Sequence, residues 1–252
     1  MKIAIVGFGR MGQLIYRLIE EGGKHEVAAV IDPVSKAPEV TALSLSAEAL
    51  GGADVAIDFT IPSVAAGNVA KYSELGIPAV VGTTGWCKGK EEVEALTQGR
   101  KKLIYSGNFS IGVLLFLRIV SAAAELMDKV DDYDVSVLEV HHNKKADAPS
   151  GTALMVAERL LEGMERKKSI VTGNPEGKIG SQEIQISSLR VGSEPGQHTV
   201  VFDGPADTIT LEHHARSREG FARGALHAAE WLVCQEDGIY TMDDFMSGLI
   251  GE

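Results

Sequence analysis

The sequence predicts an α/β protein in which a Rossmann-like, doubly wound parallel sheet is joined to a smaller α+β domain with a mixed sheet. Three observations favour this fold class. An apolar run at residues 2–6 enters a glycine turn and then an amphipathic helix, which is the order of a βα unit in a nucleotide-binding sheet. Strand and helix patterns alternate up to about residue 103, as in a parallel sheet. Three strand-like runs between residues 182 and 212 have no helical pattern between them, which is typical of a mixed or antiparallel sheet.

The first strand and helix give the clearest local pattern. Residues 2–6 (KIAIV) are apolar without interruption, as expected of a strand that is buried on both faces. Apolar residues then recur at helical spacing from Met11 to Ile19, and Gly22 with Gly23 ends the helix. The same alternation predicts further strands at 26–31, 53–59 and 77–82, and helices near 63–75 and 90–98.

The second half begins with a long apolar helix at 112–127. Arg118 and Glu125 interrupt its apolar face, and the run falls short of the roughly 20 apolar residues that a membrane span needs. We therefore expect a buried helix. The remaining elements are a strand at 132–142, a helix that opens at Ser150, the three runs between 182 and 212, and a final helix from 219.

The charge balance and the cysteines exclude several classes of protein. The chain has 24 Lys and Arg against 35 Asp and Glu, a net charge of −11, whereas nucleic-acid and anionic membrane surfaces select clustered positive charge. We therefore expect neither nucleic acid nor a membrane as a partner. Cys87 and Cys234 cannot build a disulfide framework, and the apolar run after Met1 is too short for a signal peptide. These features indicate a cytoplasmic protein.

A glycine-rich turn follows the first strand and predicts a dinucleotide site. Gly7, Gly9 and Gly12 fit the spacing G-x-G-x-x-G. The first glycine allows a tight turn, the second lets the backbone approach a pyrophosphate, and the third lets the helix pack closely on the strand. Because the helix N-terminus faces the phosphates, we expect Arg10 and Met11 to bind the cofactor as well.

The second strand ends at an acidic residue that bears on the choice of cofactor. Asp32 lies 20 residues after Gly12 (32 − 12 = 20), where a carboxylate binds the hydroxyls of the adenosine ribose. That charge would repel a 2′-phosphate, and residues 33–35 include no arginine that could neutralise one. We therefore expect NADH to be preferred, with NADPH possible through Lys36.

A second group of reactive side chains lies where the strand before Ser150 ends and a helix begins. His141 is suited to proton transfer near neutral pH. Ser150 fits a helix N-cap, so Gly151 and Thr152 would open the helix and offer N–H groups and a hydroxyl to a carboxylate or phosphate. Lys145 would add positive charge. The group predicts acid–base chemistry on an anionic substrate.

A metal site is an alternative use of these side chains. His141, His142, His213 and His214, together with Asp147, are residue types that bind metals. Adjacent histidines on a strand point to opposite faces, however, and neither a C-x-x-C nor an H-E-x-x-H motif accompanies them. We therefore expect no metal.

Two other functions share the glycine fingerprint. One is another two-domain Rossmann oxidoreductase, such as an amino-acid or polyol dehydrogenase, for which one base usually suffices and a carboxylate-binding loop of this kind is not needed. The other is a non-catalytic, NAD(H)-sensing regulator. A regulator of that class should carry a basic segment for DNA or a partner, and the sequence contains none.

The run E-V-H-H-N-K-K-A-D-A-P-S-G-T-A at 139–153 resembles the signature of the dihydrodipicolinate reductase family. The resemblance covers essentially the whole chain, although Leu114 stands where the family often has an asparagine. It implies NAD(P)H-dependent reduction of a small cyclic dicarboxylate, 4-hydroxy-tetrahydrodipicolinate (dihydrodipicolinate), to tetrahydrodipicolinate in the diaminopimelate pathway of lysine biosynthesis, by a homotetramer. Further matching motifs lie at 6–12, 57–62, 81–86, 108–113 and 217–225.

The resemblance also implies roles for individual residues. His141 matches the family's proton donor and Lys145 its second catalytic residue, with hydride added to C4 of the ring and the proton to C3. His142, Gly151 and Thr152 match ligands of the substrate carboxylate. The loops that line the nicotinamide are matched by Gly82, Thr83, Thr84, Ser106, Asn108 and Phe109. The expected domains are a dinucleotide-binding domain at 1–110, with a helical tail at 218–252 packed back on it, and a substrate-binding and tetramerisation domain at 111–217.

Overall fold

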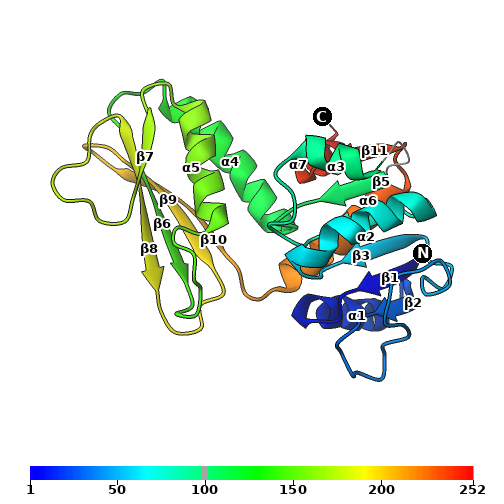
Figure 1. Ribbon diagram of the computed structural model, residues 1–252. Coiled ribbons are helices and arrows are strands. Elements are labelled where there is room, and N and C mark those ends of the chain that lie inside the picture. Colours follow the sequence, from blue (N-terminus) through cyan, green and yellow to red (C-terminus); the bar gives the residue numbers. More distant parts are fainter. Residues whose placement is uncertain (98–101, 252) are drawn as a thin grey trace. The chain divides into compact units, whose positions relative to one another are not determined.

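The chain folds into two compact units. The computed structural model describes residues 1–97 and 102–251. One unit comprises Met1–Ile111 together with Glu219–Glu252, and the other comprises Gly112–Arg218. The first unit is therefore discontinuous in sequence, because the chain leaves it after residue 111 and rejoins it at residue 219 (Figure 1).

A six-stranded parallel sheet forms the centre of the first unit. Its strand order is β11-β5-β4-β3-β1-β2. The strands are β1 (Lys2–Val6), β2 (Glu26–Ile31), β3 (Val55–Asp58), β4 (Ala79–Val81), β5 (Lys102–Tyr105) and β11 (Gly238–Tyr240). The order reverses between β1 and β3, and in open α/β sheets ligands bind at such a switch point, outside the carboxyl ends of the strands. The predicted Rossmann-like sheet is confirmed.

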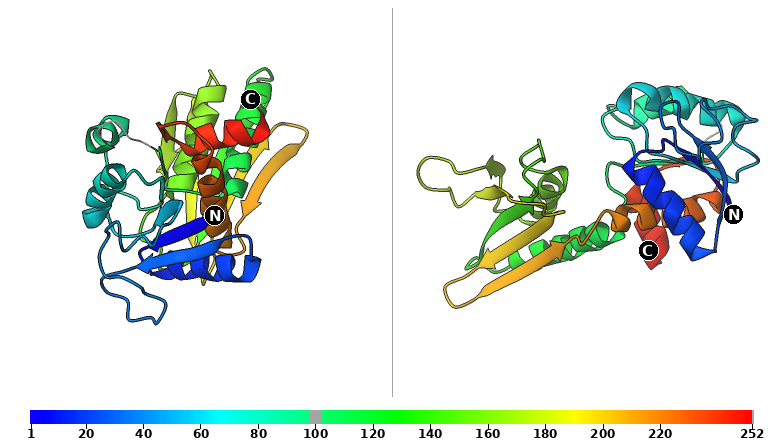
Figure 2. Two further views of the ribbon diagram at one scale, coloured as in Figure 1. Left: turned by 90° about the vertical axis from the view of Figure 1, so that its right-hand side faces the viewer. Right: turned by 90° about the horizontal axis from the view of Figure 1, so that it is seen from below.

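Helices cover both faces of this sheet. One face is covered by α1 (Arg10–Gly22) and α6 (Glu219–Val233), which pack together (Figure 2). The other face is covered by α2 (Pro62–Leu75) and α3 (Lys90–Thr97), which also pack together. Both sides of the strands are consequently buried, as the continuous apolar pattern of residues 2–6 predicted: Ile3, Ala4, Ile5 and Val6 are all buried.

The structure corrects several details of the first unit. The strands predicted at 53–59 and 77–82 are shorter, at Val55–Asp58 and Ala79–Val81, and residue 98 of the helix predicted at 90–98 lies outside the described residues. The tail is not wholly helical, because β11 adds a strand parallel to β5 before α7 (Met242–Ile250) begins. Helix α7 starts with a capping box, in which Thr241 and Asp244 hydrogen-bond each other's backbone N–H groups.

The second unit contains a five-stranded mixed sheet, also as predicted. Its order is β10-β9-β6-β8-β7, with antiparallel pairing among β10, β9 and β6 and parallel pairing among β6, β8 and β7. The strands are β6 (Asp134–His141), β7 (Ser169–Thr172), β8 (Glu183–Arg190), β9 (Gln197–Asp203) and β10 (Thr208–His214). The three runs after residue 182 correspond to β8, β9 and β10, and no helix separates them.

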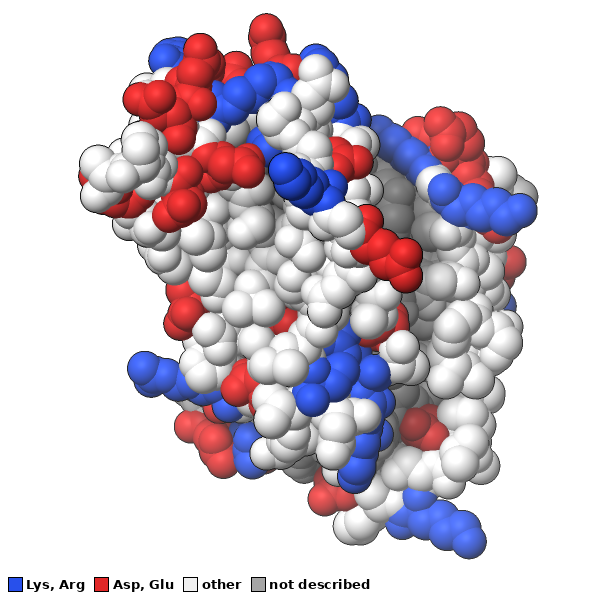
Figure 3. All heavy atoms as spheres, turned by 90° about the vertical axis from the view of Figure 1, so that its left-hand side faces the viewer, with Lys and Arg blue, Asp and Glu red and all other residues white. Residues whose placement is uncertain are grey.

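Among the described residues, helices cover one face of the mixed sheet and not the other. Helices α4 (Ile111–Met127) and α5 (Gly151–Gly163) pack on the face that carries Val137, Ile186, Val200 and Phe202. Side chains alternate along a strand, so the intervening residues form a second face, here called the open face. Figure 3 shows a broad area of uncharged side chains on this side of the unit. Among the open-face residues are Leu138, Val140, Ser187, Leu189, Thr199 and Val201.

The long apolar helix predicted at 112–127 is present and packs in the core of the second unit. Helix α4 begins at Ile111, one residue before the predicted start at 112, and ends at Met127. Its residues Val113, Phe116, Leu117 and Val120 are buried in the core of the second unit. In the part of the chain that the structure describes, no helix is both long and apolar enough to cross a membrane.

Candidate active site

The glycine turn after β1 has the shape of a phosphate cradle. Gly7 adopts φ +88, and a Cβ there would lie 2.5 Å from the Phe59 carbonyl oxygen. A Cβ on Gly12 would lie 2.1 Å from the Gly7 carbonyl oxygen, so neither position accepts a side chain. Beside Gly9, by contrast, no described residue comes within 4 Å of a Cβ. The turn is therefore packed where it supports α1 and open where a pyrophosphate would approach.

The start of α1 suits an anion. Gly9 is the N-cap of the helix and provides no side-chain cap, so the first backbone N–H groups are available to a ligand. Arg10 opens the helix and is exposed, and Met11 beside it is partly exposed. The residues that the fingerprint predicted are thus brought together at one helix end, and they fit the phosphates of a dinucleotide.

Asp32 directly follows β2, and backbone N–H groups hold its carboxylate in one orientation. Its Oδ2 accepts a hydrogen bond from Phe8 N (2.6 Å), and its Oδ1 accepts from Val34 N (2.7 Å) and Ser35 N (2.8 Å). Burial acts to raise the pKa of Asp32, but these three backbone donors outweigh it and lower the pKa below its usual value. The side chain is thus a fixed negative charge, and it joins the glycine turn to the loop after β2.

A buried carboxylate holds the next two loops of the first unit. Asp58, at the end of β3, is fully buried and accepts hydrogen bonds from Asn68 Nδ2 (2.9 Å), Tyr72 OH (2.8 Å) and Thr60 Oγ1 (2.7 Å). Burial, together with the charge of Asp58, raises the pKa of Tyr72 well above its usual value, so the phenol remains a donor. Thr60 N in turn donates to Thr83 Oγ1 (3.0 Å). The network fixes the segments around Thr60 and Thr83 at the carboxyl edge of the sheet.

The residues after β4 and β5 form two adjacent loops at the same edge. Gly82 has no room for a side chain, since a Cβ would lie 2.1 Å from the Phe59 ring, and Thr84 is exposed. The Ser106 hydroxyl accepts from Asn108 N (3.0 Å) and donates to Asn108 O (2.9 Å), which makes the second loop compact. The Phe109 side chain is buried edge-on against the Phe59 ring, so it supports this loop by packing.

In the second unit, His141 ends β6 and is largely buried. Its Nδ1 hydrogen-bonds the Glu139 carboxylate, and its ring lies edge-on to His198 with centroids 5.1 Å apart. Burial is the largest influence on the pKa of His141 and lowers it, with Lys145 and Arg190 acting in the same direction and Glu139 opposing them. A Cβ on Gly196 (φ +151) would lie 2.9 Å from Nε2 of His141, so the absence of a side chain there keeps space beside this nitrogen.

Glu139 connects this ring to the start of α5. The carboxylate is fully buried, and its Oε1 accepts from Arg190 Nη2 (2.7 Å) and from Ser150 N (3.3 Å). Burial acts to raise the pKa of Glu139, but the hydrogen bonds with Arg190 and His141 outweigh it and lower the pKa. The carboxylate is therefore held as an anion inside the unit.

The loop after β6 carries the other predicted site residues. Lys145 Nζ pairs with Asp147 Oδ1 at 2.8 Å, and this pair lowers the pKa of Asp147. As predicted, α5 begins at Gly151, and the Ser150 hydroxyl caps it by accepting from Ala153 N (3.1 Å). Gly151 is exposed with open space beside it, and Thr152 is partly exposed. Such a helix start can bind a carboxylate.

Two residues at this site were not predicted from the sequence. His198 lies opposite Glu139 on β9, and Arg190 lies opposite His141 on β8. His198 Nε2 hydrogen-bonds the Ser150 hydroxyl at 3.0 Å. Each residue comes from a strand far along the chain, and only the strand register places it beside β6. In the described part of the chain, no cluster of three or more His, Cys, Asp or Glu side chains is arranged to hold a metal ion.

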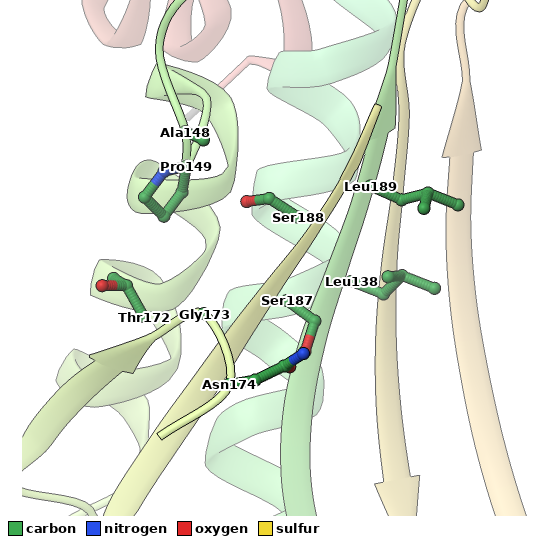
Figure 4. A pocket seen from close by; sticks show the side chains of 9 residues that line it. All are labelled: Leu138, Ala148, Pro149, Thr172, Gly173, Asn174, Ser187, Ser188 and Leu189. Carbon is green, nitrogen blue, oxygen red and sulfur yellow. The ribbon is translucent and has the colours of Figure 1, made fainter. Parts of the chain in front are cut away.

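A separate cavity lies beside the end of β7. It has a volume of about 500 Å³ and is lined by Leu138 and by residues of three segments, 148–149, 172–174 and 187–189 (Figure 4). Its lining carries no charged side chain and none of the predicted site residues. An anionic ligand would find charged and N–H donors at Lys145 and the start of α5, and it would find no charged side chain in this cavity.

Comparison with known protein families matches both halves of the chain. Residues 1–109 match the family described as "Dihydrodipicolinate reductase, N-terminus", and residues 112–246 match "Dihydrodipicolinate reductase, C-terminus". The chain is 36% identical over 250 residues to a 4-hydroxy-tetrahydrodipicolinate reductase of Christiangramia forsetii, and 99% of each chain is covered. It is 35% identical over 242 residues to the protein of the same name from Caldanaerobacter subterraneus, with 94% of each covered.

A solved structure has a similar fold over nearly the whole length. It is the dipicolinate-bound dihydrodipicolinate reductase from Paenisporosarcina sp. TG-14, which is 25% identical to this chain with a TM-score of 0.76. The match covers 96% of this chain and 97% of the other. Both units therefore have counterparts in a protein whose ligand is a small cyclic dicarboxylate.

Proposed function

The chain belongs to the dihydrodipicolinate reductase family, and we propose that it reduces 4-hydroxy-tetrahydrodipicolinate to tetrahydrodipicolinate with NAD(P)H in the diaminopimelate pathway of lysine biosynthesis. The observation that carries this proposal is the group formed by His141, Lys145 and the start of α5, which combines a proton donor with donors for a carboxylate. The family match favours this reaction over an amino-acid or polyol dehydrogenase and over an NAD(H)-sensing regulator.

The first unit binds the nicotinamide cofactor in this proposal. Gly7, Gly9, Arg10, Met11 and Gly12 hold the pyrophosphate at the start of α1. A bound reduced nicotinamide supplies the hydride, and the loops that face it are those of Gly82, Thr83, Thr84, Ser106, Asn108 and Phe109. Support for this placement comes from the switch point of the sheet and from the tight packing of these loops.

Asp32 makes NADH the preferred cofactor. Its carboxylate accepts three backbone N–H groups and is fixed as an anion, so it is oriented to accept from ribose hydroxyls and to repel a 2′-phosphate. Lys36 is exposed on the following loop and is the group through which NADPH would be accepted.

His141 donates the proton that accompanies hydride addition. Burial lowers the pKa of His141, and a dianionic substrate bound nearby would favour the charged imidazolium and raise it again. Because Nδ1 is bound to Glu139, Nε2 is the nitrogen that delivers the proton to C3 of the ring. Lys145 stabilises the charge that develops after hydride arrives at C4.

The substrate carboxylates are held by the loop after β6 and by α5. His142, Gly151 and Thr152 supply hydrogen-bond donors, and Lys145 supplies a positive charge. In a protein of net charge −11 such local donors are required, since the overall field repels a dianion. We also place the enzyme in the cytoplasm and assign it a homotetramer in which the second unit forms the subunit contacts.

A coupled assay tests the function. The substrate is generated freshly by dihydrodipicolinate synthase, and oxidation of NADH is followed by absorbance. We expect turnover only when the synthase product is present. His141→Gln should lower kcat by roughly 10²- to 10⁴-fold with a modest change in KM, because the proton is used only in the transition state. Near wild-type turnover of His141→Gln would contradict the assignment.

Lys145→Ala is the companion variant in the same assay. It should both lower kcat and raise KM, because the ammonium group meets the substrate carboxylate before the reaction as well as the charge that develops during it. Lys144→Ala, at the adjacent exposed lysine, is the matched control and should leave both constants unchanged.

A further inference from the structure

We propose that Glu139 is a positioning residue for proton transfer: its buried carboxylate sets the orientation and tautomer of His141 and ties that ring to the start of α5. This inference rests on the proposed function, since it concerns the same proton. The structural basis is one fully buried side chain that contacts His141 Nδ1 through one oxygen and both Arg190 Nη2 and Ser150 N through the other.

The tautomer follows from the hydrogen bond to His141. An ionised carboxylate can only accept, so Nδ1 of His141 must carry a hydrogen. Nε2 is then the nitrogen that gains and loses the transferable proton. It lies beside Gly196, where a Cβ would be 2.9 Å away. Glu139 on one side and the missing side chain of Gly196 on the other thus present a single nitrogen of the ring to a substrate.

The charge of Glu139 also keeps the ring able to hold a proton. The titratable and charged groups that face His141 are Glu139 on its own strand, Lys145 on the loop, Arg190 on β8, His198 on β9 and Glu194 on the loop before β9. Lys145 and Arg190 oppose protonation of the ring, as burial does. Glu139 is the anion in direct contact with it. Its removal would leave two cations and a low-polarity site, both of which favour the neutral imidazole.

Glu139 also holds the N-terminus of α5, where the substrate carboxylate is proposed to bind. Its Oε1 accepts from Ser150 N, and the Ser150 hydroxyl caps the helix at Ala153 N and bonds His198. The N-cap residue is therefore held on two sides, by β6 and by β9. One carboxylate consequently sets the relative position of the proton donor and of the helix start that binds the substrate, with both partners in the same unit.

The test compares Glu139→Gln with the wild-type full-length protein. The His141 imidazole is titrated by NMR, with His141→Gln used to assign its signal, and the pH profile of kcat/KM is measured in parallel. We expect the His141 pKa and the high-pH limb of the profile to move down together by about one unit or more. The amide retains the shape of the side chain, so KM should change less than kcat. Asp134→Asn, which removes a charge from the opposite end of β6, is the control and should shift neither.

Glu139→Gln leaves the partly buried Arg190 without its anion, and this destabilises the fold unless the cation is removed too. A second comparison avoids this: Arg190→Gln against the double variant Glu139→Gln/Arg190→Gln. The double variant should show the lower His141 pKa. Identical His141 titrations within each pair would overturn the Glu139 assignment by itself. Failure of the wild-type protein to oxidise NADH with the substrate would overturn the proposed function and leave the NMR result interpretable.

Discussion

The buried imidazole of His198, next to His141, makes the stability of the protein depend on pH. Burial, reinforced by His141, lowers the pKa of His198 from 6.5 to about 4. The unfolded chain therefore binds a proton at a higher pH than the folded chain does. The stability from neutral His198 is present in full above pH 6.5 and is lost as the pH falls from there towards about 4. The free energy of unfolding should decrease by about 2 kcal/mol between about pH 7 and pH 5.

Urea denaturation at a series of pH values measures this effect. His198→Gln keeps a donor and an acceptor for the Ser150 hydroxyl but cannot titrate, so its stability should change less over the same interval. His227→Gln, at an exposed histidine of α6, is the control and should follow the wild type. Parallel curves for wild type and His198→Gln would contradict the assignment of the pH effect to this residue.

The position and contacts of Asp32 lead to a prediction about cofactor choice. We expect kcat/KM for NADH to equal or exceed that for NADPH. Asp32→Ala should narrow the gap by relieving repulsion of the 2′-phosphate, and it should lower kcat/KM for both cofactors, since it also removes the acceptor of Phe8 N in the glycine turn. Steady-state kinetics with both cofactors gives the ratio. A tenfold preference of the wild type for NADPH, about 1.4 kcal/mol, would be the opposite result, and Lys36→Ala would then identify the cation responsible.

The residues that the sequence located are those whose neighbours are close along the chain. The glycine turn, Asp32, the Ser150 N-cap and the start of α5 each follow from spacing within about one element. His198 and Arg190 could not be found in this way, because strand register places them beside β6 and no local pattern encodes register across a mixed sheet. Glu139 was visible as part of a motif, but its contacts with both His141 and Ser150 were not.

At the scale of the elements, the open face of the mixed sheet is the surface on which we expect subunits to meet. It carries Leu138 and Leu189, which are both exposed, on neighbouring strands that α4 and α5 cover from the other side only. A half-covered apolar sheet face is typically buried by a partner. We expect the wild type to sediment as a tetramer at micromolar concentration.

Leu138→Asp tests that surface by placing a charge on it. Burial of an unpaired carboxylate is costly, so this variant should dissociate into smaller species in sedimentation velocity experiments. Leu126→Asp, at an exposed leucine of α4, is the matched control and should remain tetrameric. A wild type that is monomeric and fully active, or a Leu138→Asp variant that still sediments as a tetramer, would exclude this face as the interface.

The elements that sequence patterns located best were long or continuous, and the missed ones were short. Helices α1 and α4 and strand β1 follow directly from periodicity. Strands β5, β7 and β11 have three or four residues each, too few for an alternation to stand out, and they exist because a longer neighbour offers backbone hydrogen bonds. Helix α7 lies within the tail that was predicted to be helical, and the capping box of Thr241 and Asp244 marks its start.

At the scale of the whole molecule, a net charge of −11 coexists with a proposed dianionic substrate. The cations of the proposed site lie at particular points, each beside an acid: Lys145 pairs with Asp147, and Arg190 with Glu139. Helix starts at Gly9 and Gly151 add N–H donors that carry no net charge. Recognition of anions in this protein therefore depends on local geometry and is expected to be less sensitive to salt than binding to a basic surface would be.

The return of the chain to the first unit at Glu219 has a consequence for biosynthesis. Domains usually fold in the order in which they leave the ribosome. Here the mixed sheet is complete once Arg218 has emerged, whereas α1 still lacks α6 and the parallel sheet still lacks β11 until residues 219–240 have been made. The synthesis of the first unit thus begins before that of the second unit and is completed after it. A chain shortened after Arg218 would therefore keep every strand of the mixed sheet, but its parallel sheet would lack β11 and its α1 would lack the packing of α6.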